Sequence, residues 1–307
     1  MNGPITYDKI TIYLMSDYVY LYKVSDLKKN QYVTDKNAII CIFPSWHKSI
    51  KVNMIYDNGL SSNLIILANT EEEKNYFQQF VTCDVLYCNR NAFINENDFT
   101  VINDDKLQNF KYNMVINSCF EKYKNTIVAR SVSNVVYIGY FNGANNCDLV
   151  PRFGYVANFT GRTRNKKDHK PLQSKQINAY YNQSLVGGIF SSEEGACLAS
   201  TEYLLAGLPV ISTQSTGGRD IWYNDNNSII CKNDPDDVAR CMELAKNKLV
   251  SGEFNQNQIR NECLKLMDYF RTKLATHLSK RIIDMGYLGE INMDLLKSQI
   301  SHVIKKI

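Results

Sequence analysis

The stretch SSEEGACLASTEYLLAGLPVIST, residues 191–213, contains a short apolar helix signal with an acidic residue on either side, Glu194 and Glu202. We expect the helix to begin near residues 196–198 and to end at Ala206, because Gly207 suits the left-handed position after a helix C-terminus and Pro209 cannot continue the helix. Apolar runs with strand character lie directly before and after it, LVGGIFSS (185–192) and PVIST (209–213). The stretch therefore predicts strand, helix and strand in succession.

The chain around this stretch repeats the same alternation from residue 110 onward. Further strands are expected at YNMVINS (112–118), NVVYIGY (134–140), YVANF (155–159) and SIICK (228–232). Helices are expected around 125–132, at 174–184 with Ser174 as its N-cap, and at 233–249 with Asp234 as its N-cap. Such alternation is typical of an α/β fold with a parallel sheet that is covered on both faces.

The first third of the chain predicts a smaller α/β unit with more strand than helix. The strand-like runs are ITIYLM (10–15), YVYLYKV (18–24), AIICIF (38–43), NLIILAN (63–69), DVLYC (84–88) and FTVI (99–102). One helix is expected at 70–80, capped by Thr70. A polar, apolar-poor segment at 103–109 indicates a domain boundary. We therefore expect a small domain at 1–108, a larger one at 109–250, and C-terminal helices at 251–307 that pack back across both.

Composition is that of an ordinary soluble enzyme. The chain has 307 residues, 44% of them hydrophobic, and a formal charge of +4, which does not call for a nucleic-acid partner. Its nine cysteines include no CxxC pair, which argues against a zinc site and against a disulfide framework. Free cysteines favour a reducing compartment. No signal peptide and no long uncharged apolar run is visible, so we expect a cytoplasmic protein without a transmembrane segment.

The carboxyl ends of parallel strands are where such sheets bind ligands. The strand at 185–192 delivers Glu194, Gly195 and Ala196 to that edge, and the two small residues allow a ligand to approach the backbone closely. Glu193 is explained by an acidic preference at helix starts. Glu202 has apolar neighbours, and a buried carboxylate needs donors such as ribose or hexose hydroxyls.

The pattern E-x7-E followed by AGLPVIST and a double glycine resembles the nucleotide-sugar site of the retaining GT-B glycosyltransferases, over about residues 185–245. The resemblance implies two Rossmann-like domains that face a cleft, with the small N-terminal domain on the acceptor side. It implies that Glu194 lies against the donor sugar and Glu202 binds the ribose. By the same comparison the backbone of Gly195, Ala196, Cys197 and Leu198 lines the sugar and phosphate pocket, and Gly217 and Gly218 shape a turn that borders the donor.

That family also carries an Arg and a Lys, five positions apart, that neutralise the donor diphosphate. Lys124 occupies the Lys position here, but Cys119 occupies the Arg position, and a thiol cannot make a bidentate contact with phosphate. Other cations that could substitute are Lys122, Arg130, and Arg162 or Arg164 in the basic loop GRTRNKKDHK (161–170), which is equally consistent with a solvated charge run.

Four other residues have open interpretations. His47 and Asn69 follow strands of the first domain and are acceptor-side candidates, although packing and helix capping explain them better. Arg219 and Asp220 follow the double glycine and either pair with each other or reach the donor.

The predicted function is transfer of a sugar from a nucleotide-sugar donor to a hydroxyl of a glycan, lipid or protein, with retention of configuration. The resemblance implies that the enzyme needs no metal ion, and we expect no cofactor. Two alternatives remain: a non-catalytic nucleotide-sugar-binding or scaffold protein on a degenerate GT-B frame, which Cys119 motivates, and another GT-B chemistry such as sugar-nucleotide epimerisation.

Overall fold

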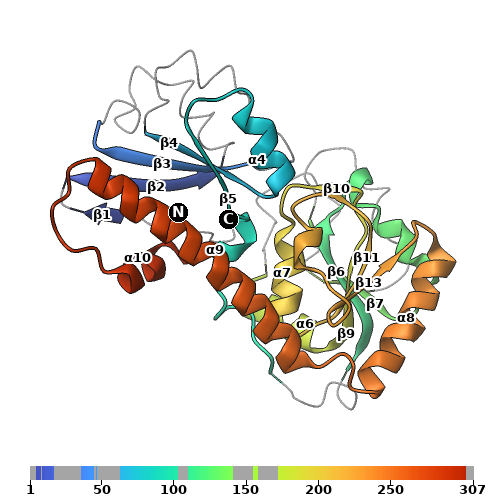
Figure 1. Ribbon diagram of the computed structural model, residues 1–307. Helices are drawn as coiled ribbons and strands as arrows, with labels where there is room; N and C mark the ends of the chain where they lie inside the picture. The colour runs from blue at the N-terminus through green and yellow to red at the C-terminus, as the bar shows by residue number, and fades with distance from the viewer. Residues whose placement is uncertain are drawn as a thin grey trace.

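The computed structural model describes residues 5–7, 9–16, 36–44, 46, 63–102, 110–140, 155–157 and 172–301. Two lobes are visible in Figure 1, each built around its own β-sheet, and a long helix runs from the second lobe back to the first. The expected YVYLYKV strand, the boundary segment 103–109, and the loop that carries Arg162 and Arg164 lie outside the described residues, as does His47.

The first sheet has the strand order β1-β2-β3-β4-β5. Its strands are β1 (Ile5–Tyr7), β2 (Ile10–Ser16), β3 (Ala38–Phe43), β4 (Leu64–Ala68) and β5 (Asp84–Tyr87). Strands β2 to β5 are mutually parallel, and β1, which the sequence pattern did not predict, pairs antiparallel with β2. Every residue of β3 and β4 is buried, as expected for central strands covered on both faces. Helix α4 (Glu71–Gln78) begins where predicted, and the Thr70 hydroxyl accepts a 3.0 Å hydrogen bond from the backbone N–H of Glu73.

The strand predicted at 99–102 is wrong. The backbone N–H of Thr100 donates to Oδ1 of Asn178 at 3.2 Å, and that of Ile102 donates to Oδ1 of Asn182 at 2.8 Å. Two backbone N–H groups of this run are therefore satisfied by side chains of a helix and not by a neighbouring strand.

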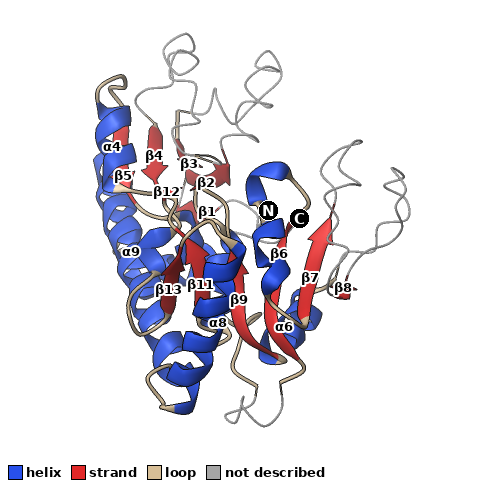
Figure 2. Cartoon of the chain, turned by 90° about the vertical axis from the view of Figure 1, so that its right-hand side faces the viewer, coloured by secondary structure: helices blue, strands red, loops and turns tan. Residues whose placement is uncertain are grey.

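The second sheet is parallel throughout and has the order β13-β11-β9-β6-β7-β8, as the row of strands in Figure 2 shows. Its strands are β6 (Tyr112–Cys119), β7 (Val135–Tyr140), β8 (Tyr155–Ala157), β9 (Ser184–Ile189), β11 (Val210–Thr213) and β13 (Ser228–Cys231). The chain proceeds from β6 to β8 in one direction and then continues from β9 in the other. The direction of winding thus reverses between β6 and β9, and the carboxyl ends of these two strands border the crevice where doubly wound sheets bind ligands.

Helix α6 (Ser174–Asn182) connects β8 with β9, and α7 (Leu198–Leu205) lies between β9 and β11. Helix α8 (Pro235–Val250) follows β13. Asp234 caps α8 as predicted. Ser174 was wrongly predicted to cap α6. The N-cap is Gln173, whose backbone N–H donates a 2.9 Å hydrogen bond to Oε1 of Gln176. The helix expected around 125–132 is a 3₁₀ helix, η4 (Thr126–Ser131), which follows Asn125 in the left-handed region at φ 50°.

The C-terminal helices are α9 (Gln256–Asp284) and α10 (Met293–Ile300). Helix α9 contacts α7 of the second lobe and the 3₁₀ turn η2 (Arg90–Phe93) of the first, and α10 packs on α9. Arg271 of α9 lies at this crossing, where its guanidinium donates to the carbonyl oxygens of Ala92 and Ile94 and pairs with Glu96. In the described ranges, no helix combines the length and the apolar composition that a bilayer crossing requires. Of the C-terminal helices expected at 251–307, the last is described to Ile300, and residues 302–307 lie outside the described part of the chain.

Candidate functional site

A pocket lies at the switch point of the second sheet. It is bordered by the ends of β6 and β9 and by the segments that follow them. The lining residues are Ile116, Asn117, Ser118, Lys124, Gly188, Ile189, Phe190, Ser191, Glu194 and Cys197. The pocket thus brings together three of the predicted site residues, Lys124, Glu194 and Cys197, in the place where an open parallel sheet binds its ligand.

Lys124 and Glu194 form an ion pair in this pocket, although 70 positions separate them in the chain. Lys124 ends the 3₁₀ turn η3 (Lys122–Lys124) after β6, and Glu194 lies in β10 (Glu193–Glu194) after β9. Their side chains are only 16% and 7% exposed, so water screens the pair poorly. The hydroxyl of Ser191 donates a second hydrogen bond, of 2.7 Å, to Oε1 of Glu194.

Burial favours neutral Lys124, but the electrostatic interactions with Cys197 and Glu194 and the hydrogen bond to Glu194 outweigh burial and raise the pKa of the ammonium group above its usual value. Burial also raises the pKa of the Cys197 thiol to about 12, so this thiol is uncharged near neutral pH. The raised pKa keeps Lys124 protonated, so the pocket contains a fixed cation at neutral pH.

One polar group in the pocket is left unsatisfied. The buried Oγ of Ser118 has no hydrogen-bond partner among the described residues. Buried hydroxyls are normally hydrogen-bonded, so this oxygen is available to a ligand or a water molecule.

The loop between β9 and α7 is held by the double glycine. Glu194 of β10 pairs with Gly217 of β12 (Thr216–Gly217), and the N–H of Gly218 donates to the carbonyl of Gly195 at 2.7 Å. Gly217 has φ 99°, a conformation that favours glycine. A Cβ atom on Gly218 would lie 2.5 Å from Cβ of Asn69 and 2.6 Å from the oxygen of Gly195, so no side chain fits there. Glu193 is exposed, in agreement with its exclusion from the site.

Asparagines of the first domain bind the same loop, and the sequence contained no signal for them. The side-chain amide of Asn91 donates to the carbonyls of Ala196 at 2.6 Å and Cys197 at 3.0 Å. The amide of Asn89 donates to the carbonyl of Gly218 at 2.8 Å. Both asparagines are fully buried, so the first domain forms part of the support of the loop.

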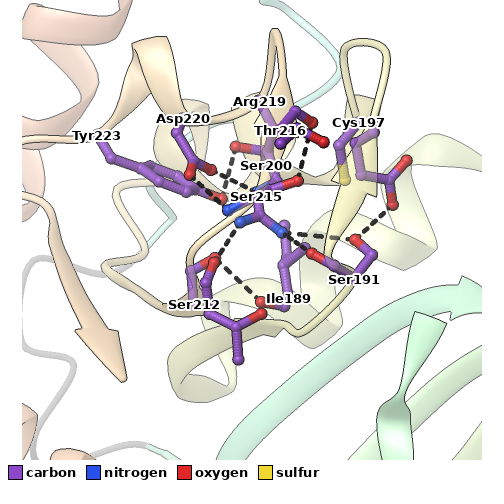
Figure 3. Close-up of polar contacts among 12 residues, drawn as sticks. Ile189, Ser191, Cys197, Ser200, Ser212, Ser215, Thr216, Arg219, Asp220 and Tyr223 are labelled. Atoms are coloured by element: carbon purple, nitrogen blue, oxygen red, sulfur yellow. Dashed lines mark hydrogen bonds and ion pairs between the residues drawn. The ribbon is translucent and has the colours of Figure 1, made fainter. Parts of the chain in front are cut away.

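Arg219, one of the residues left open by the sequence, is fully buried, and its polar contacts are drawn in Figure 3. Its Nε pairs with Asp220 at 2.6 Å, which decides between the two alternatives left open above. Its terminal nitrogens donate to the carbonyl of Ser191 at 2.8 Å and to the carbonyl of Thr213. The guanidinium thus ties the residues that follow β9 to the end of β11, and it does not line the pocket in the described part of the chain.

Glu202 lies elsewhere. It is 1% exposed and lines a second pocket. The other residues that line this pocket are Ile94, Asn95, Asp98, Phe99, Ser174 and Leu198. Its Oε2 accepts a 2.7 Å hydrogen bond from the hydroxyl of Tyr181 and a longer one, 3.4 Å, from the amide of Asn117. The structure therefore places the two glutamates in different pockets and gives Glu202 partners within the protein.

The other phosphate-side candidates that the structure describes do not line the pocket. Cys119 is 3% exposed, and its sulfur lies 3.4 Å from the hydroxyl of Tyr123. Lys122 and Arg130 are exposed and are not among the described residues that line the pocket. Among the described residues, no group of three His, Cys, Asp or Glu side chains could hold a metal ion.

Comparisons with known proteins identify the fold. No protein-family model and no curated protein matches this sequence. Among solved structures, sucrose-phosphate synthase of Thermosynechococcus elongatus matches with a TM-score of 0.61 and 12% identity, over 90% of this chain and 74% of the other. TarM matches at 0.59 and 14%, over 87% and 54% of the two chains. HepE of Anabaena, solved in complex with UDP-glucose, matches at 0.54 and 10%, over 94% and 77%.

These neighbours are GT-B glycosyltransferases. The chain therefore has the α/β GT-B fold, with two Rossmann-like domains that face a cleft, as the sequence predicted. At 10–14% identity the likeness establishes the fold alone.

Proposed function

We propose that this protein is a retaining glycosyltransferase that moves a sugar from a nucleotide-sugar donor to an acceptor hydroxyl. The observation that carries the proposal is the buried ion pair of Lys124 and Glu194 at the switch point between β6 and β9. A cation there suits a diphosphate, and a carboxylate beside it suits sugar hydroxyls. The structural neighbour HepE was solved with UDP-glucose, and TarM of S. aureus with UDP and α-GlcNAc-glycerol, which supports a donor of this class.

In this proposal the donor rearranges the ion pair. Diphosphate oxygens compete with Glu194 for the Lys124 ammonium, and the released carboxylate accepts hydrogen bonds from hydroxyls of the donor sugar. When the bond between the anomeric carbon and the phosphate oxygen breaks, negative charge grows on the leaving diphosphate, and Lys124 stabilises it. The leaving oxygen accepts the proton of the acceptor hydroxyl as that hydroxyl attacks from the same face, which retains the configuration. No metal ion enters this scheme.

The loop of Gly195, Ala196, Cys197 and Leu198, with Gly217 and Gly218 behind it, would contribute backbone groups to the donor. Glu202 would bind the ribose. A carboxylate oxygen accepts more than one hydrogen bond, so in this proposal Glu202 accepts from a ribose hydroxyl as well as from Tyr181.

Calorimetric titration with UDP, GDP and ADP tests donor binding, and release of nucleoside diphosphate from a panel of nucleotide sugars tests turnover. Lys124→Gln should weaken diphosphate binding at least about tenfold, because a charge-assisted contact is lost. Lys122→Gln is the matched control, since Lys122 is an exposed lysine of the same 3₁₀ turn and should leave the affinity unchanged. If none of the three nucleotides binds, or if both variants behave alike, the proposal fails.

Glu202→Gln tests the ribose contact separately. The proposal expects weaker binding of UDP with little change in the binding of inorganic pyrophosphate, which has no ribose. Tyr181→Phe is its control, because it removes one intramolecular hydrogen bond to Glu202 and leaves the carboxylate in place. Equal loss of affinity for both ligands in Glu202→Gln would assign Glu202 a structural role only.

A second candidate function is nucleotide-sugar binding without turnover. The observation that favours it is the burial of Cys119 where the related enzymes carry a phosphate-binding arginine. Binding of a nucleotide sugar without release of its diphosphate, in the presence of acceptors, would support this alternative.

A further inference from the structure

An aromatic pair joins the two domains beside the Lys124 pocket. Trp46 lies three residues beyond the end of β3, and Tyr123 lies in η3, beyond the end of β6. Their ring centroids are 5.1 Å apart, with an interplanar angle of 73°. Both residues follow the carboxyl ends of parallel strands, one in each sheet, so they lie on the cleft side of both domains.

The two rings are accessible in spite of their contact. Trp46 is 43% exposed and Tyr123 is 39% exposed. Aromatic side chains of this size dominate the energetics of interfaces, and their edge-to-face contact holds the pair in a defined geometry. Together they form a small, angled apolar surface at the cleft.

Tyr123 connects this surface with the proposed reaction centre. It directly precedes Lys124, whose ammonium nitrogen lies 5.2 Å from the centroid of the Tyr123 ring. The Tyr123 hydroxyl is also within 3.4 Å of the Cys119 sulfur, which anchors the far end of the side chain. A molecule that rests on the pair is therefore held next to the cation assigned to the leaving diphosphate.

The chemistry of the surface favours a saccharide. A sugar ring presents C–H groups on its faces and hydroxyls around its edge, so its face can lie on an aromatic ring while an edge hydroxyl points towards a polar pocket. A lipid chain would need a continuous apolar groove, whereas the described residues contribute two rings beside a buried ion pair to this surface.

We propose that Trp46 and Tyr123 form the acceptor subsite and bind a sugar unit of a carbohydrate acceptor, an inference that rests on the proposed transfer reaction. The aromatic pair selects a pyranose by its C–H face and places a hydroxyl towards Lys124 and the donor sugar. The first domain contributes Trp46, and the second contributes Tyr123, so the subsite exists only when the two domains meet.

Intrinsic fluorescence tests the proposal without any turnover. The chain has two tryptophans, and Trp222 is only 3% exposed, so a change on adding a saccharide reports chiefly on Trp46. The probes are methyl glycosides of glucose, galactose, mannose and N-acetylglucosamine, titrated with and without saturating UDP. We expect at least one glycoside to shift the emission in a saturable way.

Substitutions of Trp46 and Tyr123 test whether these two rings form the glycoside-binding surface. Trp46→Ala and Tyr123→Ala should each raise the dissociation constant of that glycoside about tenfold, measured by calorimetry. Trp46→Ala should leave UDP binding unchanged. Trp46→Phe retains a ring and should stay within about threefold. Tyr269→Ala is the matched control, because Tyr269 is an equally accessible aromatic, 54% exposed, on α9.

The outcomes separate this proposal from the proposed function. If UDP binds but no glycoside shifts the emission, the subsite is overturned and the donor site stands. If glycosides bind through Trp46 but no nucleotide binds, the proposed saccharide subsite is supported and the proposed transferase function is overturned. If phosphatidylcholine vesicles shift the emission and glycosides do not, the saccharide assignment is overturned in favour of a lipid.

Discussion

The side-chain amide of Asn91 donates a 2.6 Å hydrogen bond to the carbonyl oxygen of Ala196, and so the N-terminal domain holds the loop that follows β9. The same amide bonds to the carbonyl of Cys197 and the hydroxyl of Thr201. The loop that carries Glu194 is therefore positioned by both domains, and the geometry of the pocket depends on how the domains meet.

Asn91→Ala should lower the free energy of unfolding by about 1–3 kcal/mol, because it leaves two buried carbonyls with one donor fewer. It should also weaken UDP binding, since the loop loses its support. Denaturant unfolding and calorimetry measure the two effects. The exposed Asn97→Ala is the control, with an expected change within about 0.5 kcal/mol. Equal effects of the two variants would contradict a role for Asn91 in holding the loop.

Arg219→Met should destabilise the protein by about 3–5 kcal/mol, because the carbonyls of Ser191 and Thr213 and the carboxylate of Asp220 lose a buried partner. Thermal or denaturant unfolding measures this loss. Arg240→Met is the control: the Arg240 side chain is 64% exposed and pairs with Asp237 at the surface, so little change is expected. A native-like stability of Arg219→Met would show that the buried guanidinium is dispensable.

Cys197→Gly should be more stable than Cys197→Ala by about 1–2 kcal/mol. Cys197 has φ 54°, in the left-handed region, where any Cβ is strained and glycine is not. The comparison with alanine cancels the loss of the sulfur atom, and chemical denaturation of both variants gives the difference. The opposite order would mean that the surrounding loop imposes no strain at this position.

The free energy of unfolding should fall as the pH rises above about 9, under reducing conditions. Burial raises the pKa of Cys41, Cys197 and Cys231 from 9.0 to about 12. Between these values the unfolded chain loses thiol protons that the folded protein keeps, so each deprotonation favours the unfolded state. Below pH 9 both states are protonated at these thiols and the contribution is constant.

Denaturant unfolding at intervals from pH 7.5 to 10 measures this dependence, with the Cys197→Ala variant as a comparison. That variant removes one of the three thiols, so its stability should decline less steeply with pH. A stability that stays flat up to pH 10 in the unmodified protein would contradict the burial of these groups.

Much of the fold could be predicted from short-range patterns. Each of the confirmed elements follows from residues within a few positions of one another. Examples are the strands at AIICIF and LVGGIFSS, the helix that ends before Gly207, and the caps Thr70 and Asp234. The run at 99–102 was wrongly predicted to be a strand. An apolar run has the same sequence pattern whether its backbone bonds to a neighbouring strand or to asparagine side chains.

The candidate site was predictable only in part. The sequence by itself determined an α/β chain with parallel sheets and placed Lys124, Glu194 and Gly218 at strand ends, since strand and helix periodicity are local properties. The tertiary structure alone decided that Lys124 pairs with Glu194, that Arg219 is buried against Ser191 and Thr213, and that Trp46 meets Tyr123. These contacts join residues of different strands or domains, and their partners depend on the order of strands in the sheet and on the docking of two domains, which no local pattern encodes.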